Sequence, residues 1–78
     1  MMNCTRQSAT KEIRLAAKKV GLTFKTMRYM RINGFRAFEF CDRQTGLVKF
    51  SNCTFWSAYE NVCSGFISTY DKTLGFFK

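Results

Sequence analysis

The chain has 78 residues, of which 46% are hydrophobic and 17% aromatic, and its formal net charge is +8. This length fits one domain, the apolar content is too high for a disordered chain, and no apolar run approaches the roughly 20 residues of a membrane span. The sequence contains no histidine, which excludes imidazole as a general base, as the partner of a nucleophile or as a metal ligand.

The first predicted element is a helix over residues 9–20. Ser8 or Thr10 is placed to cap it, and small or aliphatic residues then recur at the spacing of one helix face. These residues are Ile13, Ala16, Ala17 and Val20. Gly21 follows where a left-handed residue commonly ends a helix. Residues 1–7 show no periodicity, and we expect them to be flexible or docked on a partner.

A β-hairpin is predicted next, with strands over residues 22–32 and 35–41 joined by Asn33-Gly34, a pair that favours a tight type I′ turn. If both strands are regular, the turn fixes their register. The expected pairs are Ile32 with Phe35, Met30 with Ala37, Tyr29 with Phe38, Arg28 with Glu39 and Met27 with Phe40. Side-chain alternation then turns Met27, Tyr29, Phe38 and Phe40 toward the core, and leaves an Arg28–Glu39 ion pair on the wetter face.

A second turn over residues 42–46 leads to a third predicted strand over residues 47–51. Thr54 is placed to cap a second helix, whose apolar stripe consists of Phe55, Ala58, Tyr59, Val62 and Phe66. We expect this helix to end near Ser64 or to kink at Gly65.

This order predicts an α+β fold of the αβββα type: a three-stranded antiparallel sheet with two helices packed on one face, in a single domain over residues 1–78. The predicted core between the sheet and the second helix consists of Phe38, Phe40, Phe50, Tyr59 and Val62. The tail over residues 71–78 ends in Phe76-Phe77, which we expect either to dock on the body or to meet a partner chain. A homodimer through Phe76 and Phe77 is one form of the second option.

The net charge is concentrated in the first half of the chain. Residues 1–36 contain nine basic side chains and one acid, whereas residues 37–78 contain four of each. Such a positive lobe attracts polyanions, although the same charges also keep a small apolar domain soluble. The candidate partner- or nucleic-acid-binding residues are Lys11, Arg14, Lys18, Lys25, Arg28, Arg31 and Arg36.

The hairpin tip is the sharpest of these candidates. The turn places Arg31 and Arg36 side by side on neighbouring strands, where like charges repel. This pairing does not stabilise the fold. Its presence therefore favours an anionic partner that binds both arginines. Reversing the charges of Arg43 and Lys49, in the neutral half, is expected to matter much less.

The four cysteines do not follow the spacing of a metal site. Cys4, Cys41, Cys53 and Cys63 are separated by 37, 12 and 10 residues, and no C-x-x-C occurs. We expect buried thiols and neither a metal nor another cofactor, with a Cys53–Cys63 or Cys41–Cys53 disulfide as the alternative in an oxidising compartment. The sequence also lacks the glycine-rich phosphate-binding motifs and any catalytic set, so we expect no catalytic residues and no enzymatic activity.

The helix–three strands–helix order resembles the double-stranded-RNA-binding fold and the HicA-type toxin endoribonucleases built on it. The stretch AAKKVGLTFKTMRYMRINGFRAFEF is similar to the first helix and hairpin of such a toxin. The catalytic histidine of the toxin has no counterpart, so the resemblance does not imply ribonuclease activity.

With its small size and the stretches INGFRAFEFCDRQTG and SNCTFWSAYENV, the chain also resembles small phage and prophage proteins of the anti-CRISPR type. That resemblance implies a non-enzymatic binding protein that inhibits or modulates a host nucleic-acid machine, and we expect it to occupy the surface of that machine sterically through its own basic surface. The alternative is a direct DNA- or RNA-binding module that uses the basic first helix and hairpin. The N-terminal stretch MMNCTRQSATKE lacks the apolar segment of a secretory signal, so we expect the cytoplasm, that of the host bacterium if a phage encodes the protein.

Overall fold

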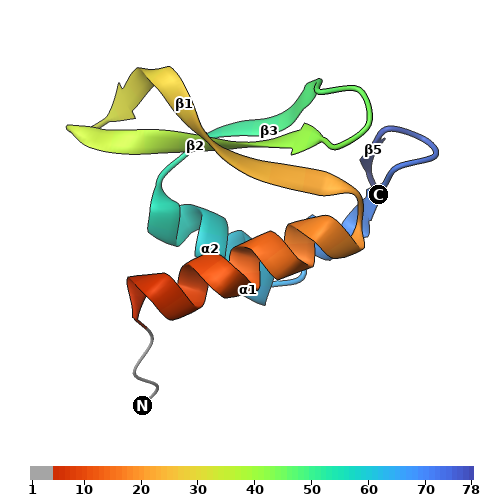
Figure 1. Cartoon of the computed structure of the whole chain (residues 1–78), viewed down its shortest axis with the longest axis horizontal. Helices are drawn as coiled ribbons and strands as arrows, with labels where there is room; N and C mark the ends of the chain where they lie inside the picture. The colour runs from red at the N-terminus through yellow and green to blue at the C-terminus, as the bar shows by residue number, and fades with distance from the viewer. Residues whose placement is uncertain (1–4) are drawn as a thin grey trace.

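The computed structural model describes residues 5–78, apart from the side chain of Asn52. Its elements are α1 (Arg6–Lys19), β1 (Leu22–Ile32), β2 (Phe35–Asp42), β3 (Val48–Cys53), α2 (Phe55–Cys63), a short 3₁₀ turn η1 (Ile67–Thr69), β4 (Tyr70–Asp71) and β5 (Phe76–Phe77). The three long strands form an antiparallel sheet in the order β1-β2-β3, and both helices lie on one side of it (Figure 1). The predicted α+β fold is therefore confirmed.

Helix α1 begins at Arg6, earlier than predicted. Its N-cap is Thr5, whose side chain accepts a hydrogen bond from the backbone N–H of Ser8 at 3.0 Å, so Ser8 and Thr10 lie inside the helix. Ala9, Ile13 and Ala17 are fully buried, which confirms the predicted apolar face. Gly21 has a φ of 83° and ends the helix as expected. Cys4 lies outside the described residues.

The hairpin turn forms as predicted, but the register beyond it does not. Asn33 and Gly34 both have positive φ, and Arg31 pairs with Arg36 next to the turn. Further along, the register shifts so that Thr26 lies opposite Phe38. The predicted pairs of Met27, Arg28 and Tyr29 are therefore wrong, because Phe40, Glu39 and Phe38 pair with Phe24, Lys25 and Thr26 instead. Residues 27–30, here called the β1 bulge, lie opposite Ala37 alone and arch away from β2 (Figure 1).

The β1 bulge reverses which side chains of β1 face the helices. A regular hairpin would have turned Thr23 and Lys25 into the core and Leu22 and Phe24 outward. In the structure Leu22 is fully buried and the ring of Phe24 stacks on that of Phe38, with centroids 4.9 Å apart. Tyr29, predicted to face the core, is 93% exposed. The bulge thus keeps a lysine out of the core and brings two large apolar side chains in.

The second turn and helix α2 follow the prediction closely. Thr54 caps α2 by accepting a hydrogen bond from the N–H of Ser57 at 3.3 Å. The helix ends at Cys63, and Gly65 has a φ of 89°. Strand β3 runs two residues further than the predicted strand, to Cys53.

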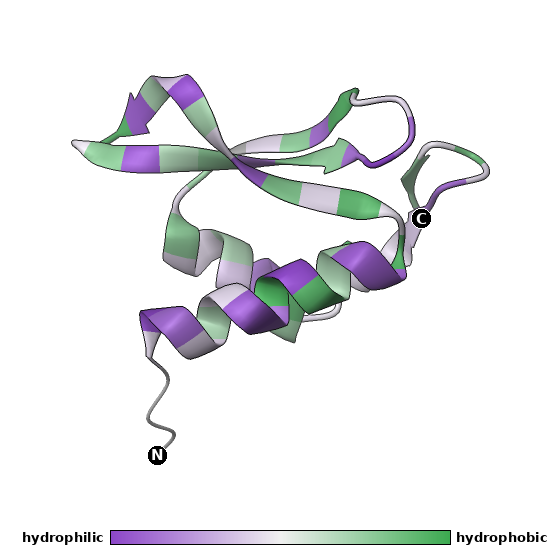
Figure 2. Cartoon of the chain, in the orientation of Figure 1, coloured by the Kyte–Doolittle hydropathy of each residue, from purple (hydrophilic) through white to green (hydrophobic). Residues whose placement is uncertain are grey.

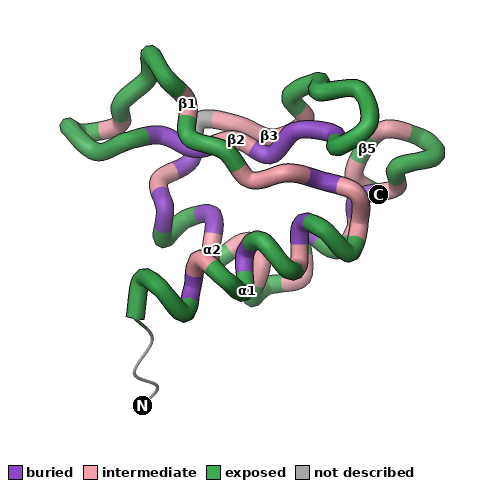
Figure 3. Tube along the Cα trace, in the orientation of Figure 1, coloured by how far each residue is buried: buried purple, intermediate pink, exposed green. Residues whose placement is uncertain are grey.

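The core lies between the sheet and both helices. Phe38 and Phe40 are buried, and the other three predicted core residues, Phe50, Tyr59 and Val62, are partly buried and pack against them. Helix α1 adds its buried face to the same cluster, a contribution that the prediction had not included. The hydroxyl of Tyr59 donates a hydrogen bond to Glu12 at 2.7 Å, which ties α2 to α1. Figures 2 and 3 show how apolar and buried residues are distributed along the sheet and the two helices.

The C-terminal tail docks on the body. Strands β4 and β5 pair, and the ring of Phe77 stacks on that of Phe66 with centroids 4.7 Å apart. Phe77 also contacts the rings of Phe50 and Tyr70. Phe76 is 55% exposed, so the expected homodimer contact through the tail would have to use this ring.

Asp42 joins the β2–β3 turn to the C-terminal segment. Its carboxylate is buried and accepts hydrogen bonds from the Tyr70 hydroxyl at 2.5 Å and from the N–H groups of Gln44 and Thr45 at 2.9 and 3.0 Å. These hydrogen bonds hold the pKa of Asp42 below its ordinary value, and the bond from Tyr70 has the largest effect. The pKa of Tyr70 is raised to about 12, mainly by burial and next by the hydrogen bond to the Asp42 carboxylate.

We expect Asp42→Asn to lower the melting temperature at pH 7. A carboxyl with a lowered pKa stabilises the fold above its unfolded pKa of about 3.9, and this stabilisation is lost as the pH falls through the folded pKa. The difference in melting temperature between Asp42→Asn and the unmodified protein should therefore become smaller below about pH 4. Thermal melts from pH 7 down to pH 2 measure it, with Glu60→Gln on the exposed side of α2 as the control. An equal difference at both ends of the pH range would contradict the assignment.

Candidate functional site: a basic groove between α1 and β1

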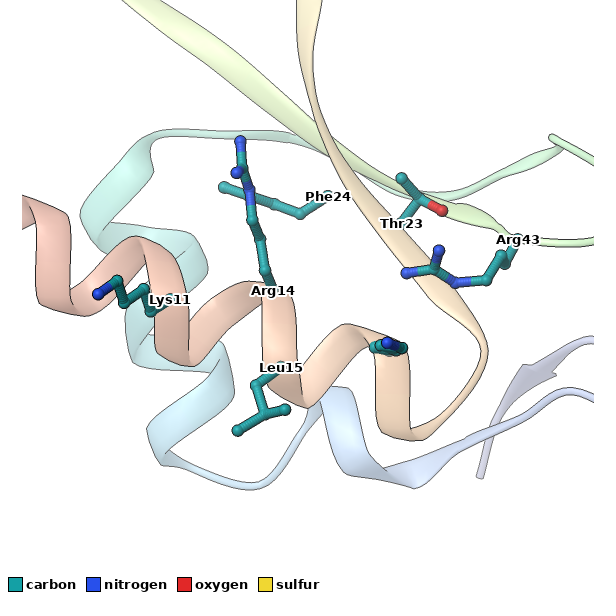
Figure 4. A pocket seen from close by; sticks show the side chains of 7 residues that line it. Lys11, Arg14, Leu15, Thr23, Phe24 and Arg43 are labelled. Carbon is teal, nitrogen blue, oxygen red and sulfur yellow. The ribbon is translucent and has the colours of Figure 1, made fainter.

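A groove of about 530 Å³ runs between α1 and β1 (Figure 4). Residues from three segments line this α1–β1 groove: Lys11, Arg14, Leu15 and Lys18 from α1, Thr23 and Phe24 from β1, and Arg43 from the β2–β3 turn. Four of the seven are cationic and none is acidic. The groove therefore presents positive charge from both of its sides.

Helix α1 places three cations along one wall because of their spacing. Lys11, Arg14 and Lys18 are three and four residues apart and all are exposed. At about 1.5 Å per residue they span about 10 Å of helix axis. The axial spacing of phosphates on one strand of a duplex is about 3.4 Å, so a row of this length can contact several successive phosphates. These three predicted binding residues therefore share one site.

The fourth cation, Arg43, was missed by the sequence reasoning. Its Nη2 donates a hydrogen bond to the carbonyl oxygen of Leu22 at 3.1 Å, and its backbone N–H donates to Gly21 at 2.8 Å. The antiparallel pairing of Leu22 with Asp42 brings the end of β2 beside the start of β1, which carries Arg43 into the groove. Arg43 is therefore unsuitable as the charge control that its position in the neutral half suggested.

The groove also has apolar surface. Leu15 is 58% exposed on α1, and Phe24 is half-buried on β1. Figure 4 shows Arg14 rising from α1 on the side of Phe24, and the Arg43 guanidinium turned back toward β1. Cations beside an aromatic ring suit a ligand that combines negative charge with planar or apolar groups.

The other predicted binding residues lie elsewhere. Lys25 is exposed on β1 and lies opposite Glu39. Arg28 is part of the β1 bulge, where it lines a shallow cavity of about 290 Å³ with its three neighbours and Glu39. Arg31 and Arg36 are cross-strand partners at the hairpin tip, as predicted. The seven predicted residues thus form no single surface.

We expect Arg31→Glu to stabilise the protein. Directly opposed side chains on paired strands have Cβ atoms about 4.5–5.5 Å apart, so the exposed Arg31–Arg36 pair is repulsive and an Arg–Glu pair is attractive. The gain should be about 0.2–1 kcal/mol in free energy of unfolding, measured by urea denaturation at low salt. Arg28→Glu, in the bulge, makes the same change in net charge without an opposed cation on the paired strand and serves as the control. Equal effects from both variants would show that the gain comes from net charge.

The thiols of the described residues are held in different environments. Cys41 and Cys53 are buried, and their Sγ atoms donate to the Glu39 carboxylate at 3.3 Å and to the Phe38 carbonyl at 3.4 Å. Burial is the main cause that raises the pKa of both thiols, which keeps them protonated at neutral pH. Cys63 is exposed. Within residues 5–78, no three cysteine or carboxylate side chains gather as metal ligands.

No protein-family model, curated protein or solved structure matches this chain. Neither helix in the part of the chain that the structure describes is long and apolar enough to cross a membrane.

Proposed function

We propose that this protein is a non-enzymatic binding protein that holds a nucleic-acid backbone in the α1–β1 groove. The observation that carries the proposal is the convergence of Lys11, Arg14, Lys18 and Arg43 on one groove without an acidic residue. Arg43 is distant from the other three in sequence, so a solvated helix face does not account for its position.

The binding mode is sequence-independent. Lysine binds phosphate as a point charge, and arginine offers two parallel N–H groups to a pair of phosphate oxygens. Contacts to phosphates fix the position of the strand without reading bases. Each neutralised phosphate releases condensed counterions, so the affinity falls steeply as salt rises.

The test is an anisotropy titration of a labelled oligonucleotide at several salt concentrations between about 50 and 200 mM. With four contacts, the plot of log K against log salt should have a slope of about −3 to −4. An affinity that does not change with salt, or no binding at 50 mM, would overturn the proposal.

The β1 bulge favours a second candidate function, docking on a protein. Tyr29 is 93% exposed and Met30 43% exposed, next to Met27 and Arg28. Tyrosine, methionine and arginine are enriched at protein interfaces, and the fold gains nothing by exposing them here. In this function the protein is an anti-CRISPR-like inhibitor, encoded by a phage, that covers a surface of a host nucleic-acid machine.

Affinity capture from a bacterial lysate, with and without nuclease, separates the two functions. The nucleic-acid binder should lose its captured material after nuclease treatment, and Tyr29→Ala should not change the capture. The inhibitor should retain a protein partner after nuclease treatment and lose it in the Tyr29→Ala variant.

A further inference from the structure

A second cavity, of about 430 Å³, lies between the hairpin tip and the N-terminus of α2. Four of its nine lining residues are aromatic, Phe35, Phe38, Phe55 and Trp56, and it is here called the aromatic pocket. Phe35 is 70% exposed and Trp56 48% exposed. Two large rings therefore line an open cavity whose volume falls in the usual range for small-molecule sites, about 300–1,000 Å³.

Cations flank the aromatic pocket on both sides. Arg6, from the first turn of α1, places its guanidinium carbon 4.1 Å above the centroid of the Phe55 ring. Arg36 lines the pocket from the hairpin side, next to its cross-strand partner Arg31. The lining contains no acid. A guanidinium beside a ring keeps several N–H groups with which it can bind phosphate oxygens.

Ring contacts connect the aromatic pocket to the α1–β1 groove. Phe24 lines the groove, and its ring stacks on Phe38 and lies edge-on to Phe55, both of which line the pocket. Helix α1 also connects the two sites, because Arg6 borders the pocket and Lys11 begins the row of cations in the groove. Both sites therefore border α1, the pocket at its first turn and the groove from Lys11 onward.

We infer that the aromatic pocket receives an unpaired base of a single-stranded nucleic acid whose backbone lies in the α1–β1 groove. This inference rests on the proposed function and adds the ligand class to it. Stacking on aromatic side chains needs an exposed base face, which a duplex does not offer. The joint presence of open aromatic rings and flanking arginines is the combination that binds base and phosphate together.

The protein contains one tryptophan, so Trp56 reports directly on the aromatic pocket. Three ligands of equal length, about 12 nucleotides, are compared: an oligothymidylate, an abasic strand with the same backbone, and a duplex. Fluorescence of Trp56 reports occupancy of the pocket, and anisotropy of a label on the ligand reports overall binding. The oligothymidylate should quench Trp56 and bind at least fivefold more tightly than the other two ligands.

Two substitutions test the pocket independently. Trp56→Ala and Phe35→Ala should each weaken binding of the oligothymidylate by at least fivefold and leave binding of the abasic strand unchanged. Trp56→Phe, which retains a ring, should restore most of the affinity. Tyr29→Ala removes an aromatic side chain that is 93% exposed and lies outside the pocket, and it is the control. Thermal melts establish that each variant is folded.

The outcomes distinguish the inference from the proposed function. Equal affinity for the oligothymidylate and the abasic strand, without quenching, would overturn the base site and leave backbone binding in the groove intact. Tighter binding of the duplex would also overturn the base site. If no oligonucleotide binds, the proposed function fails, and quenching of Trp56 by an acidic peptide instead would assign the pocket to a protein partner.

Discussion

Replacing Phe38 by alanine is expected to lower the free energy of unfolding by about 3–5 kcal/mol. Phe38 is buried, its ring stacks on Phe24, and its edge contact with Phe55 joins the sheet to α2. Removal of the ring leaves a cavity between the sheet and α2, which can relax only partly to fill it. Domains of this size have a free energy of unfolding near the lower end of about 5–15 kcal/mol, so the substitution removes most of the stability of the fold.

Urea denaturation and thermal melts followed by circular dichroism measure this loss. Phe76→Ala, which removes the same side chain at a 55% exposed position, is the matched control and should change the stability little. A Phe38→Ala variant with an unchanged melting temperature would show that the stack on Phe24 does not hold the sheet and α2 together.

The second large effect is expected in binding, from Arg14→Glu combined with Lys18→Glu. Both side chains line the α1–β1 groove, and their reversal puts negative charge where the proposed function places phosphates. We expect the affinity for an oligonucleotide to fall by about 100-fold, or about 2.7 kcal/mol, at low salt. The loss should shrink at high salt because screening reduces both attraction and repulsion.

The matched control is Lys19→Glu combined with Lys49→Glu. It makes the same change in net charge, and neither residue lines the groove. Lys18 and Lys19 both lie in the last turn of α1, so reversing either one has a similar effect on the helix dipole. An equal loss of affinity in both double variants would show a diffuse charge effect and contradict a defined groove.

Local patterns in the sequence determined most of the secondary structure. The apolar spacing of Ile13 and Ala17, the cap at Thr54, and the Asn33-Gly34 turn each depend on neighbouring residues, and all three are present in the structure. The element order then allowed one compact arrangement, with both helices on the same face of the sheet. The start of α1 was placed too late because Thr5, Ser8 and Thr10 are all competent caps and local sequence does not rank them.

The register of β1 was decided by the tertiary structure. The Asn33-Gly34 turn fixes pairing only next to itself, and a regular continuation would have buried Lys25 and exposed Phe24. Burial of Leu22 and Phe24 against the helices outweighs the ladder hydrogen bonds lost in the β1 bulge, so the strand takes the irregular path. The sequence contains one indication of this path. Residues 22–26 alternate between the large apolar Leu22 and Phe24 and the polar Thr23 and Lys25, which places Leu22 and Phe24 on one face of the strand.

The candidate sites divide in the same way. The sequence by itself determined that positive charge is concentrated in the first half and that α1 carries Lys11, Arg14 and Lys18 in a row, because charge content and helical spacing are local properties. Only the tertiary structure brought Arg43 to that row and joined Arg6, Phe35 and Trp56 around one pocket. These contacts join residues that are far apart in the chain, and they form only when strand pairing and helix packing close the distance between them.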